Sequence, residues 1–331
     1  MARGTLLRQL IKTGVQGSPD DFRRVSEQII REERQKQHHL LANDLEKILY
    51  GNVAKPYPGL NRIQDKIPTD SERGLPLMFI KEPVHQLEDV VLSEENESVI
   101  EQIFLEHRRC DVIKSYGLRS ADKLLFYGPP GCGKTLTSEI IASELNLPFA
   151  VVRIESVISS YLGETAANLR KIFDFIDSTP MIVLFDEFDA LAKERSDAGD
   201  HGELKRVVNT VLQMMDAYMG KSLIIAATNH EVILDEAIWR RFEEVLLFEM
   251  PDQDHITKLL SVKLRGVRCE FSTDDIDVAQ LFNGMSHADI ERTLRRAIKD
   301  MILCGQEFLR KTHIKKALER EKTRQRRLKN S

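Results

Sequence analysis

The segment with the clearest chemistry reads GPPGCGKT and runs from Gly128 to Thr135. Its spacing is that of a phosphate-binding loop, G-x-x-x-x-G-K-[ST], and it lies between the apolar run LLFY and a stretch of helical character. Glycines let backbone N–H groups converge on phosphate oxygens, and the following helix adds its positive dipole end. We therefore predict that nucleotide phosphates are held by Gly128, Pro129, Pro130, Gly131, Cys132, Gly133, Lys134, Thr135 and Leu136.

Two side chains of this loop have distinct chemical roles. Lys134 supplies a mobile cation for the β- and γ-phosphates of ATP. Thr135 offers a hydroxyl to Mg²⁺, a hard ion that prefers oxygen ligands. Cys132 is interpreted as a small, tightly packed loop residue rather than as a nucleophile. The loop thus predicts ATP and Mg²⁺ as the cofactors.

A pair of carboxylates follows further along the chain, in MIVLFDEFDAL. The apolar residues up to Phe185 predict a buried strand that ends in Asp186 and Glu187. The carboxyl end of a parallel strand is where such sheets bind ligands. We expect Asp186 to hold hydrated Mg²⁺ and Glu187 to polarise the water that attacks the γ-phosphate. Such a pair alone is typical of a solvated surface, and the phosphate-binding loop is what favours catalysis.

Short apolar segments alternate with helical stretches through the middle of the chain, which predicts an α/β fold with a parallel sheet covered by helices on both faces. The pattern after Pro251 is purely helical. Near the N-terminus an amphipathic pattern without Pro or Gly precedes a Pro- and Gly-rich stretch. We predict a helical N-terminal region that recruits a partner or substrate (1–50), a linker (51–76), the sheet domain (77–250) and a helical lid with a basic tail (251–331).

Composition argues against several classes of protein. The net charge of −4 and pI near 6.2 argue against a dedicated nucleic-acid binder. No apolar run approaches the ~20 residues needed to span a bilayer, and the first residues do not resemble a secretory signal, so we expect a cytoplasmic protein without a membrane partner. The four cysteines form no CxxC pair, as expected for reduced thiols. The basic run KTRQRRLKN is either a solvated helix end or a nucleic-acid contact.

Taken together, these motifs resemble the AAA+ ATPases, specifically the AAA branch that includes katanin, spastin, the membrane-fusion disassembly ATPases and the proteasomal ATPases. The resemblance covers about residues 87–305. In LIIAATNH, Asn229 follows a strand, where the resemblance implies an amide that positions the attacking water. LDEAIWRRFEE resembles the arginine-finger segment, which implies that Arg240 and Arg241 reach the γ-phosphate bound by a neighbouring subunit.

Two further segments concern contacts to the nucleotide. LEDVV resembles the segment that wraps the adenine, which implies contacts by Asp89 and Val90. GMSHADIERTLRRA resembles the sensor 2 region at the start of a lid helix, which implies a nucleotide contact by Ala288. This chain has His287 where the family usually has a small residue, so the geometry of that contact stays open. His287 either reports the nucleotide state or packs on the linker side of the lid.

SSYLGETAANLRKIF resembles the family's first pore loop, with Tyr161, Leu162 and Gly163 as its contact residues. On its own, an aromatic–aliphatic pair is more typical of a core. The resemblance implies that these residues grip a protein substrate in the axial channel of a ring.

The resemblance as a whole implies an Mg-dependent ATPase that forms a homo-oligomeric ring, most simply a hexamer, and remodels or unfolds a protein by threading it through the pore. No protease segment follows the lid, so we expect a separately encoded effector or protease. Two alternatives stay open. One is a nucleic-acid-associated ATPase, such as a loader or a transposition or defence regulator, which the acidic balance and the aromatic pore loop oppose. The other is an ATP-switched scaffold with low turnover, which the full set of catalytic residues opposes.

Overall fold

In this computed structural model, the structure describes residues 6, 12, 19–35, 63, 66–70, 74–157, 162–189, 203–230 and 236–329. The chain divides into two compact units, Met1–Pro58 and Gly59–Ser331. The first unit contains helix α2, Pro19–Gln35. Proline is well suited to the first position of a helix, because the N–H that it lacks would have no intrahelical partner there. Among the described residues, no helix is long and apolar enough to cross a membrane.

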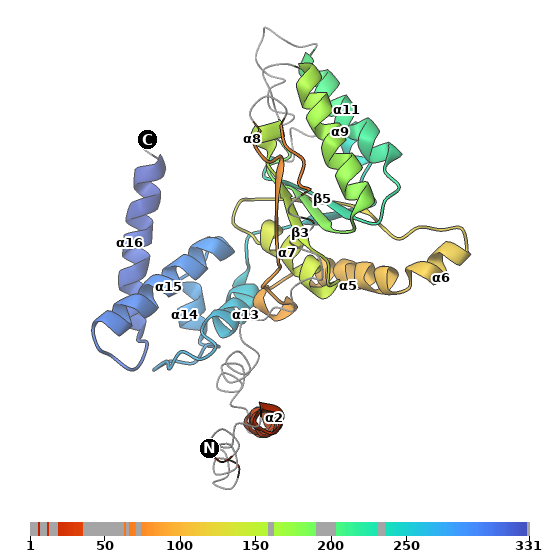
Figure 1. Cartoon of the computed structure of the whole chain (residues 1–331). Helices are drawn as coiled ribbons and strands as arrows, with labels where there is room; N and C mark the ends of the chain where they lie inside the picture. Colours follow the sequence, from red (N-terminus) through yellow and green to blue (C-terminus); the bar gives the residue numbers. More distant parts are fainter. Residues whose placement is uncertain are drawn as a thin grey trace. The chain divides into compact units, whose positions relative to one another are not determined.

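The second unit is built on a six-stranded sheet with the order β1-β3-β4-β5-β2-β6 (Figure 1). The strands are β1 (Met78–Lys81), β2 (Lys123–Tyr127), β3 (Phe149–Val152), β4 (Ile182–Phe185), β5 (Leu223–Thr228) and β6 (Glu244–Leu247). Strands β2 to β6 pair in parallel, whereas β1 pairs antiparallel with β3 at one edge. The predicted α/β fold class is confirmed, and the antiparallel edge strand is an addition to it.

Helices cover both faces of the sheet, with α9 and α11 on one side and α5 and α7 on the other (Figure 1). The helices around the sheet are η1 (Leu87–Asp89), α5 (Glu94–Arg108), α6 (Cys110–Ser115), α7 (Lys134–Glu144), α8 (Ile154–Val157), α9 (Leu162–Ser178), α11 (Glu203–Ala217) and α12 (Glu236–Trp239). The C-terminal helices are α13 (Gln253–Lys263), α14 (Ile276–Gln280), α15 (His287–Leu303) and α16 (Lys311–Lys329). These last four pack around a hydrophobic cluster of their own.

Strand β4 illustrates why the sheet is covered on both sides. Val183 and Phe185 enter the cluster beneath α9 and α11, whereas Ile182 and Leu184 enter the opposite cluster with α5 and α7. Successive side chains of a strand point to opposite faces, so a strand that is apolar at every position must be covered on both faces. All four residues of β4 are buried.

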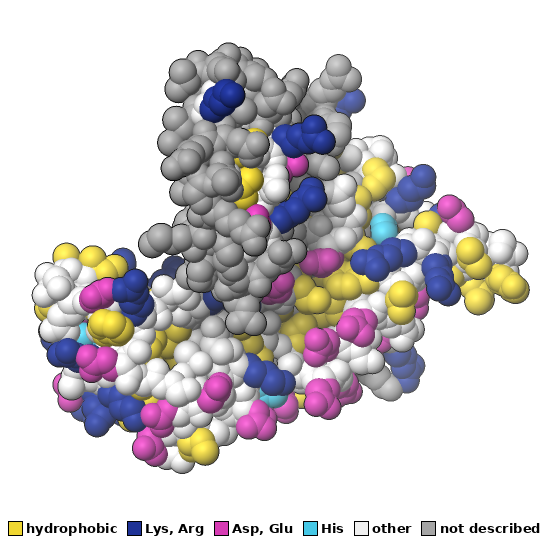
Figure 2. Space-filling model, turned by 90° about the horizontal axis from the view of Figure 1, so that it is seen from below, with side chains coloured by type: hydrophobic (Ala, Val, Ile, Leu, Met, Phe, Trp, Pro, Cys, Tyr) yellow, Lys and Arg dark blue, Asp and Glu magenta, His cyan; other side chains and the backbone are white. Residues whose placement is uncertain are grey.

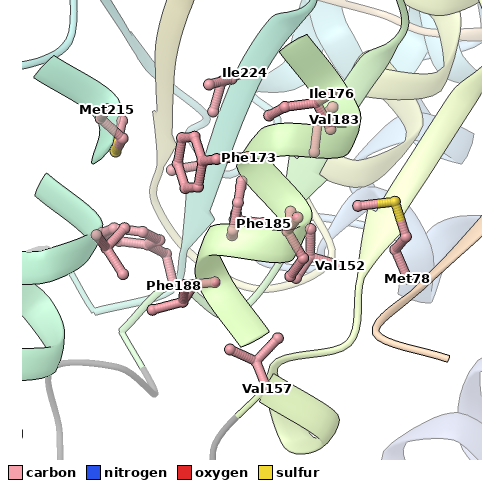
Figure 3. Close-up of a cluster of buried hydrophobic side chains, with 14 of the residues drawn as sticks. Met78, Val152, Val157, Phe173, Ile176, Val183, Phe185, Phe188, Met215 and Ile224 are labelled. Atoms are coloured by element: carbon pink, nitrogen blue, oxygen red, sulfur yellow. The ribbon is translucent and has the colours of Figure 1, made fainter. Parts of the chain in front are cut away.

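Aromatic rings surround the end of β4. Figure 3 shows Phe185 in the cluster with Phe173 and Phe188, and the ring of Phe185 lies 6.2 Å from that of Phe173 and 6.5 Å from that of Phe188. The Phe185–Phe188 pair is edge-to-face, a favourable arrangement for two aromatic rings. The residue directly before the predicted catalytic pair is therefore held rigidly by the core.

The segment before β1 packs on the sheet domain, although it falls within the predicted linker, 51–76. Ile63 and Ile67 contact the cluster beneath α9 and α11. The N–H of Asp70 donates to the carbonyl of Leu75 over 2.8 Å. Proline and glycine limit regular structure in this stretch, but burial of its apolar side chains still favours packing.

Helix α16 is joined to α15 by a cluster of charges around Glu321, whose side chain is fully buried. Arg292, Arg296 and Arg324 donate to its carboxylate over 2.9, 3.0 and 2.8 Å. Burial alone would raise the pKa of Glu321, but the hydrogen bonds from Arg292 and Arg324 hold it below its ordinary value. Part of the positive charge of the C-terminal run is thus used to stabilise the lid.

One group of hydrophobic side chains is exposed near α6. Val112, Tyr116 and Leu118 are exposed, and Tyr116 is 79% accessible. Figure 2 shows hydrophobic side chains gathered at the right of the view, on the side where Figure 1 places α6. An apolar group of this kind is typical of a surface that contacts another protein.

We predict that Phe185→Ala lowers the free energy of unfolding by about 3–5 kcal/mol, because it empties a site enclosed by aromatic rings. Urea denaturation of the full chain measures the loss. The matched control is Phe79→Ala on β1, whose side chain is 43% exposed and whose loss is expected to stay below about 1 kcal/mol. Equal losses in the two variants would contradict the assignment of Phe185 to the core.

Candidate nucleotide site

The phosphate-binding motif forms the turn between β2 and α7. Strand β2 ends at Tyr127, and α7 begins at Lys134. Gly133, the residue before the helix, has a φ of +103°, a backbone conformation that residues with a Cβ rarely adopt. The motif therefore lies at a helix N-terminus, where backbone N–H groups without intrahelical partners face a ligand.

Gly128 is required for a second reason, which is a close approach between two backbone segments. Its φ is +126°, and a Cβ at this position would collide with the carbonyl oxygen of Phe248, the residue that follows β6. The N–H of Phe248 donates to the carbonyl of Tyr127 over 2.8 Å. The start of the loop is thus pressed against the chain that leads into the C-terminal helices.

Lys134 is buried at the base of the loop. Its Nζ donates to the carbonyl oxygens of Gly128 over 2.7 Å and Pro129 over 2.9 Å. Burial lowers the pKa of this amine, and nearby carboxylates, including Asp186, oppose that shift. Cys132 is also buried, and burial raises the pKa of its thiol, as expected for a packed loop residue.

The predicted carboxylate pair lies directly opposite the loop. The hydroxyl of Thr135 donates to Asp186 Oδ2 over 2.9 Å, which brings together the two side chains predicted to hold Mg²⁺. The backbone N–H of Glu187 donates to the other oxygen of Asp186 over 3.0 Å. The Glu187 side chain is exposed, so it can reach a water molecule in the space between β4 and the loop.

Glu187 has an unusual backbone conformation, with a φ of +52°. Such values are uncommon for residues with a Cβ and persist only where the surroundings impose them. Here the next residue imposes it, because the N–H of Phe188 donates to the carbonyl of Ala227 on β5 over 2.8 Å, and the Phe188 ring is buried in the core. The sharp turn directs the Glu187 side chain out of the strand end.

These elements enclose a cavity of about 350 Å³. Among its lining residues are most of those predicted to bind or hydrolyse the nucleotide: Asp89, Val90, Pro130, Gly131, Cys132, Gly133, Lys134, Thr135, Leu136, Asp186, Glu187, Asn229 and Ala288. Asn229 is the first residue after β5, and its partly exposed side chain lies beside the carboxylate pair. Gly128 and Pro129 contribute the carbonyls that hold Lys134.

Residues 124–250 match the family described as ATPase family associated with various cellular activities (AAA). The chain is also 42% identical over 324 residues to an uncharacterized AAA family ATPase, y4kL, of Sinorhizobium fredii, in an alignment that spans 98% of this chain and 97% of that protein. The chain belongs to the AAA ATPase family. This membership supports ATP binding and ATPase activity.

The lid of this AAA protein contributes further cavity residues that were not predicted to bind the nucleotide. Leu259 and Lys263 on α13 and Glu291 on α15 line it. Lys263 Nζ donates to the carbonyl of Asp89 over 3.3 Å and pairs with Glu291 over 3.1 Å. A charged pair on two helices looks like an ordinary solvated pair in the sequence, so only the fold could bring it to the site.

The lid also contacts the phosphate-binding loop directly. The N–H of Ala288 donates to the carbonyl of Gly131 over 3.0 Å, and a Cβ on Gly131 would approach Ser286 Oγ at 2.8 Å. Ser286 is the N-cap of α15 and accepts from the N–H of Asp289. Because Gly131 has no side chain, the first turn of α15 can pack against the phosphate-binding loop of the AAA domain.

A hydrogen bond between Asp189 and Thr228 connects the segment that carries the carboxylate pair to the segment that carries Asn229. The hydroxyl of Thr228 donates to Asp189 Oδ1 over 3.1 Å and accepts from the N–H of His230 over 3.0 Å. Both Asp189 and Thr228 are buried. These hydrogen bonds fix the ends of β4 and β5 relative to one another.

Other predicted residues lie away from this cavity or outside the described chain. Arg240 and Arg241 follow α12 and are not among the residues that line the cavity. The Nε of Arg241 pairs with Asp216 on α11 over 3.0 Å. Leu162 and Gly163 begin α9, whereas Tyr161 lies outside the described residues.

We predict that Gly128→Ala disrupts this site, because a methyl group cannot fit against the Phe248 carbonyl. The expected loss in free energy of unfolding is about 2–5 kcal/mol, with a parallel loss of ATP affinity. Gly117 is a matched control, since its φ is +75° and, its chain neighbours aside, no atom of the described residues lies within 4 Å of the point that a Cβ would occupy there. Gly117→Ala is expected to cost only about 1–2 kcal/mol and to keep ATP affinity. Urea denaturation and calorimetric ATP titration measure both quantities.

Proposed function

We propose that this AAA protein is an Mg-dependent ATPase that assembles into a homo-oligomeric ring, most simply a hexamer, and unfolds or remodels a protein substrate. Within the family, we place it with the branch of katanin, spastin and the proteasomal ATPases, on the motifs described above. One observation carries the proposal: the loop, the carboxylate pair and Asn229 share one cavity, while the two arginines predicted to act on the same nucleotide do not line it.

The side chains around the cavity divide the work of hydrolysis. Lys134 would bind the β- and γ-phosphates once its ammonium leaves the loop carbonyls. Glu187 would orient and polarise the attacking water, and Asn229 would hold that water in line. Phosphoryl transfer depends mainly on positioning and charge stabilisation, which is what these fixed groups provide.

The oxygen atoms beside the loop fit Mg²⁺. Thr135 Oγ1 and Asp186 Oδ2 lie 2.9 Å apart, and Mg²⁺ is usually held by one or two protein oxygens together with water and substrate phosphates. When bound, Mg²⁺ neutralises charge that builds up on the phosphates. In this proposal Thr135 is a direct ligand, and Asp186 orients the ion's hydration shell.

The positions of Arg240 and Arg241 support an active site shared between subunits. An arginine that stabilises the γ-phosphate must reach the nucleotide, and neither residue lines the cavity of its own chain. In a ring with head-to-tail contacts, the same surface of every subunit meets the cavity of the next one. The exposed apolar group near α6 is consistent with such protein–protein contacts.

A subunit-mixing experiment tests the base and the arginines together. Glu187→Gln and the double variant Arg240→Ala, Arg241→Ala should each lose most ATPase activity, with a fall of about 10²–10⁴-fold for the missing base. Mixed subunits should regain activity wherever an intact cavity meets an intact arginine pair, in about a quarter of the interfaces of a random ring. The steady-state ATPase rate of an equimolar mixture measures this recovery.

The control for mixing is each variant combined with wild-type subunits at the same total concentration, which calibrates subunit exchange. ATP binding by Glu187→Gln should stay close to that of the wild type, because this residue acts on water rather than on the phosphates. Absence of recovery in a mixture that does exchange subunits would contradict arginines acting in trans. Near-normal turnover by Glu187→Gln alone would refute the base assignment.

Protein substrates would be gripped by Tyr161, Leu162 and Gly163, whose sequence resembles a pore loop. An aromatic ring offers a large contact area with few rotamers to freeze, so it can bind and release an extended chain of any sequence. Gly163 would supply backbone freedom. The resulting motor would work with a separately encoded effector or protease.

We predict that Tyr161→Ala keeps nucleotide binding, assembly and most basal ATPase activity but loses stimulation by an unfolded protein. Tyr161→Phe is the matched control and should keep stimulation, since it retains the ring. ATPase rates with and without a permanently unfolded protein measure the effect. If Tyr161→Ala instead lowers the free energy of unfolding by about 3–5 kcal/mol, Tyr161 belongs to the core.

The same ATPase assay separates this function from a nucleic-acid-associated one. Helix α16 carries many Lys and Arg residues, which would favour DNA if they were free to bind it. Arg324, however, is paired with the buried Glu321. Stimulation by duplex DNA and not by unfolded protein would favour the alternative function.

A further inference from the structure

His287 lies at the boundary of two cavities. It is the first residue of α15. Its side chain lines the nucleotide cavity and also a second cavity of about 90 Å³ that lies beside the chain following β6. The N-cap Ser286 fixes the backbone at this point, so the ring is placed by a rigid helix start.

Both ring nitrogens of His287 are buried and have no hydrogen-bond partner within the described part of the chain. Leaving a buried donor and a buried acceptor unsatisfied costs free energy, so a native structure needs a reason for such a group. An imidazole used only for packing could be replaced by an apolar ring without this cost.

The polar side chains of α13 that line these cavities with His287 are engaged in other contacts. His255, Leu259 and Lys263 lie four residues apart along one face of α13, the helix that lines both cavities with His287. His255 pairs with Asp252 over 2.6 Å, and Lys263 is bound to Asp89 and Glu291. The most direct remaining partner is a molecule in the nucleotide cavity.

The ring stays neutral in this environment. Burial lowers the pKa of His287 to about 4, and the positive charges of His255 and Lys263 contribute to the shift. A neutral imidazole has one N–H donor and one acceptor nitrogen. It can therefore bind a group that offers a donor or an acceptor but no charge.

The part of the nucleotide that reaches His287 follows from the rest of the cavity. The phosphates are directed to the loop and the N-terminus of α7. The remaining wall comes from η1, α13 and α15, with the apolar side chains of Val90 and Leu259 and the polar ring of His287. A purine suits this wall, since it has apolar faces and a polar edge of uncharged donors and acceptors.

We propose that the neutral imidazole of His287 hydrogen-bonds the edge of the nucleotide base and so helps this site to select adenine. The proposal rests on ATP binding at this cavity and adds to it a side-chain contact to the base. His287 is then a specificity-determining residue, distinct from the groups that act on the phosphates. A bound base would supply a hydrogen-bond partner for at least one of the two ring nitrogens that have none within the described part of the chain.

The test is a thermodynamic cycle between the side chain and single atoms of the ligand. Calorimetry on the full chain gives the affinity for ADP, for purine riboside diphosphate, which lacks the exocyclic amine, and for analogues that lack one ring nitrogen each. Diphosphates are used because they are not hydrolysed. Wild type and His287→Phe are compared, since Phe keeps a planar ring but has neither nitrogen.

If His287 contacts the base, one analogue should bind the wild type about three- to tenfold more weakly than ADP, the effect of one neutral hydrogen bond. In His287→Phe the same analogue should bind as well as ADP. His287→Gln, which keeps a donor and an acceptor, should restore part of the difference. His255→Ala is the matched control: His255 lines only the smaller cavity, so the ratios between nucleotides should not change.

Two results would overturn the proposal. If every analogue keeps its ratio to ADP in His287→Phe, the ring does not touch the base. If only 2′-deoxy-ADP changes its ratio, the contact is to the ribose. Should His287→Phe unfold, the same ratios in His287→Gln and His287→Ala decide the question. If the wild type does not bind ADP, the nucleotide site itself is refuted. This result can be told apart from a failure of the His287 proposal, in which ADP still binds.

Discussion

The alignment of three parallel strands, β2, β5 and β4, is the constraint on which the site depends. Tyr127 on β2 lies opposite Thr228 on β5, and Phe185 on β4 lies opposite Ala226 two residues earlier. Because the strands run in parallel and end at the same edge, whatever follows each strand emerges at the same place. The loop, Asn229 and the carboxylate pair come from segments far apart in the chain, and one register brings them together. A shift of a single residue would turn each side chain of β4 to the opposite face and displace Asp186 and Glu187 relative to the loop.

The second constraint is that the cavity has two walls from different hydrophobic clusters. The loop and the carboxylate pair that line it belong to the sheet domain, whereas Leu259, Lys263, His287, Ala288 and Glu291 belong to the lid helices. Among the described residues, contacts between the two parts include Ala288 to the Gly131 carbonyl, Lys263 to the Asp89 carbonyl and Arg265 to Glu88. A ligand that spans both walls adds contacts across the boundary, so its binding and release must change how strongly the lid is held.

The features that depend on local chemistry could be predicted from the sequence. The loop, the strand end at Phe185 and the alternation of strands and helices follow from short patterns, and the fold class that they predicted is confirmed. The antiparallel edge strand was not predicted, because four residues at Met78–Lys81 carry too little pattern. Lys263 was missed because no motif covers its segment, and Glu291 was missed because, although it lies within GMSHADIERTLRRA, its side chain looks there like a solvated charge. His287 could be singled out only as a departure from a pattern, and its orphaned nitrogens became visible only in the folded lid.

The strained turn at Glu187 connects the hydrophobic core to the chemistry. A residue with a Cβ rarely takes a φ of +52°, so some part of the structure must offset the cost. The support comes from the core on both sides: Phe185 is packed between aromatic rings, and Phe188 is buried and hydrogen-bonded to β5. Because the core fixes both Phe185 and Phe188, the backbone of the two residues between them cannot relax to a more common conformation. The carboxylates of Asp186 and Glu187 therefore project from the strand end toward the loop. The aromatic cluster beneath α9 and α11 therefore does more than stabilise the fold, since its rigidity sets the direction in which Glu187 points.

Because α9 begins at Leu162, the same cluster lies beneath the helix that follows the predicted pore loop. A change in packing around Phe173 and Phe185 would therefore affect both α9 and the turn at Glu187.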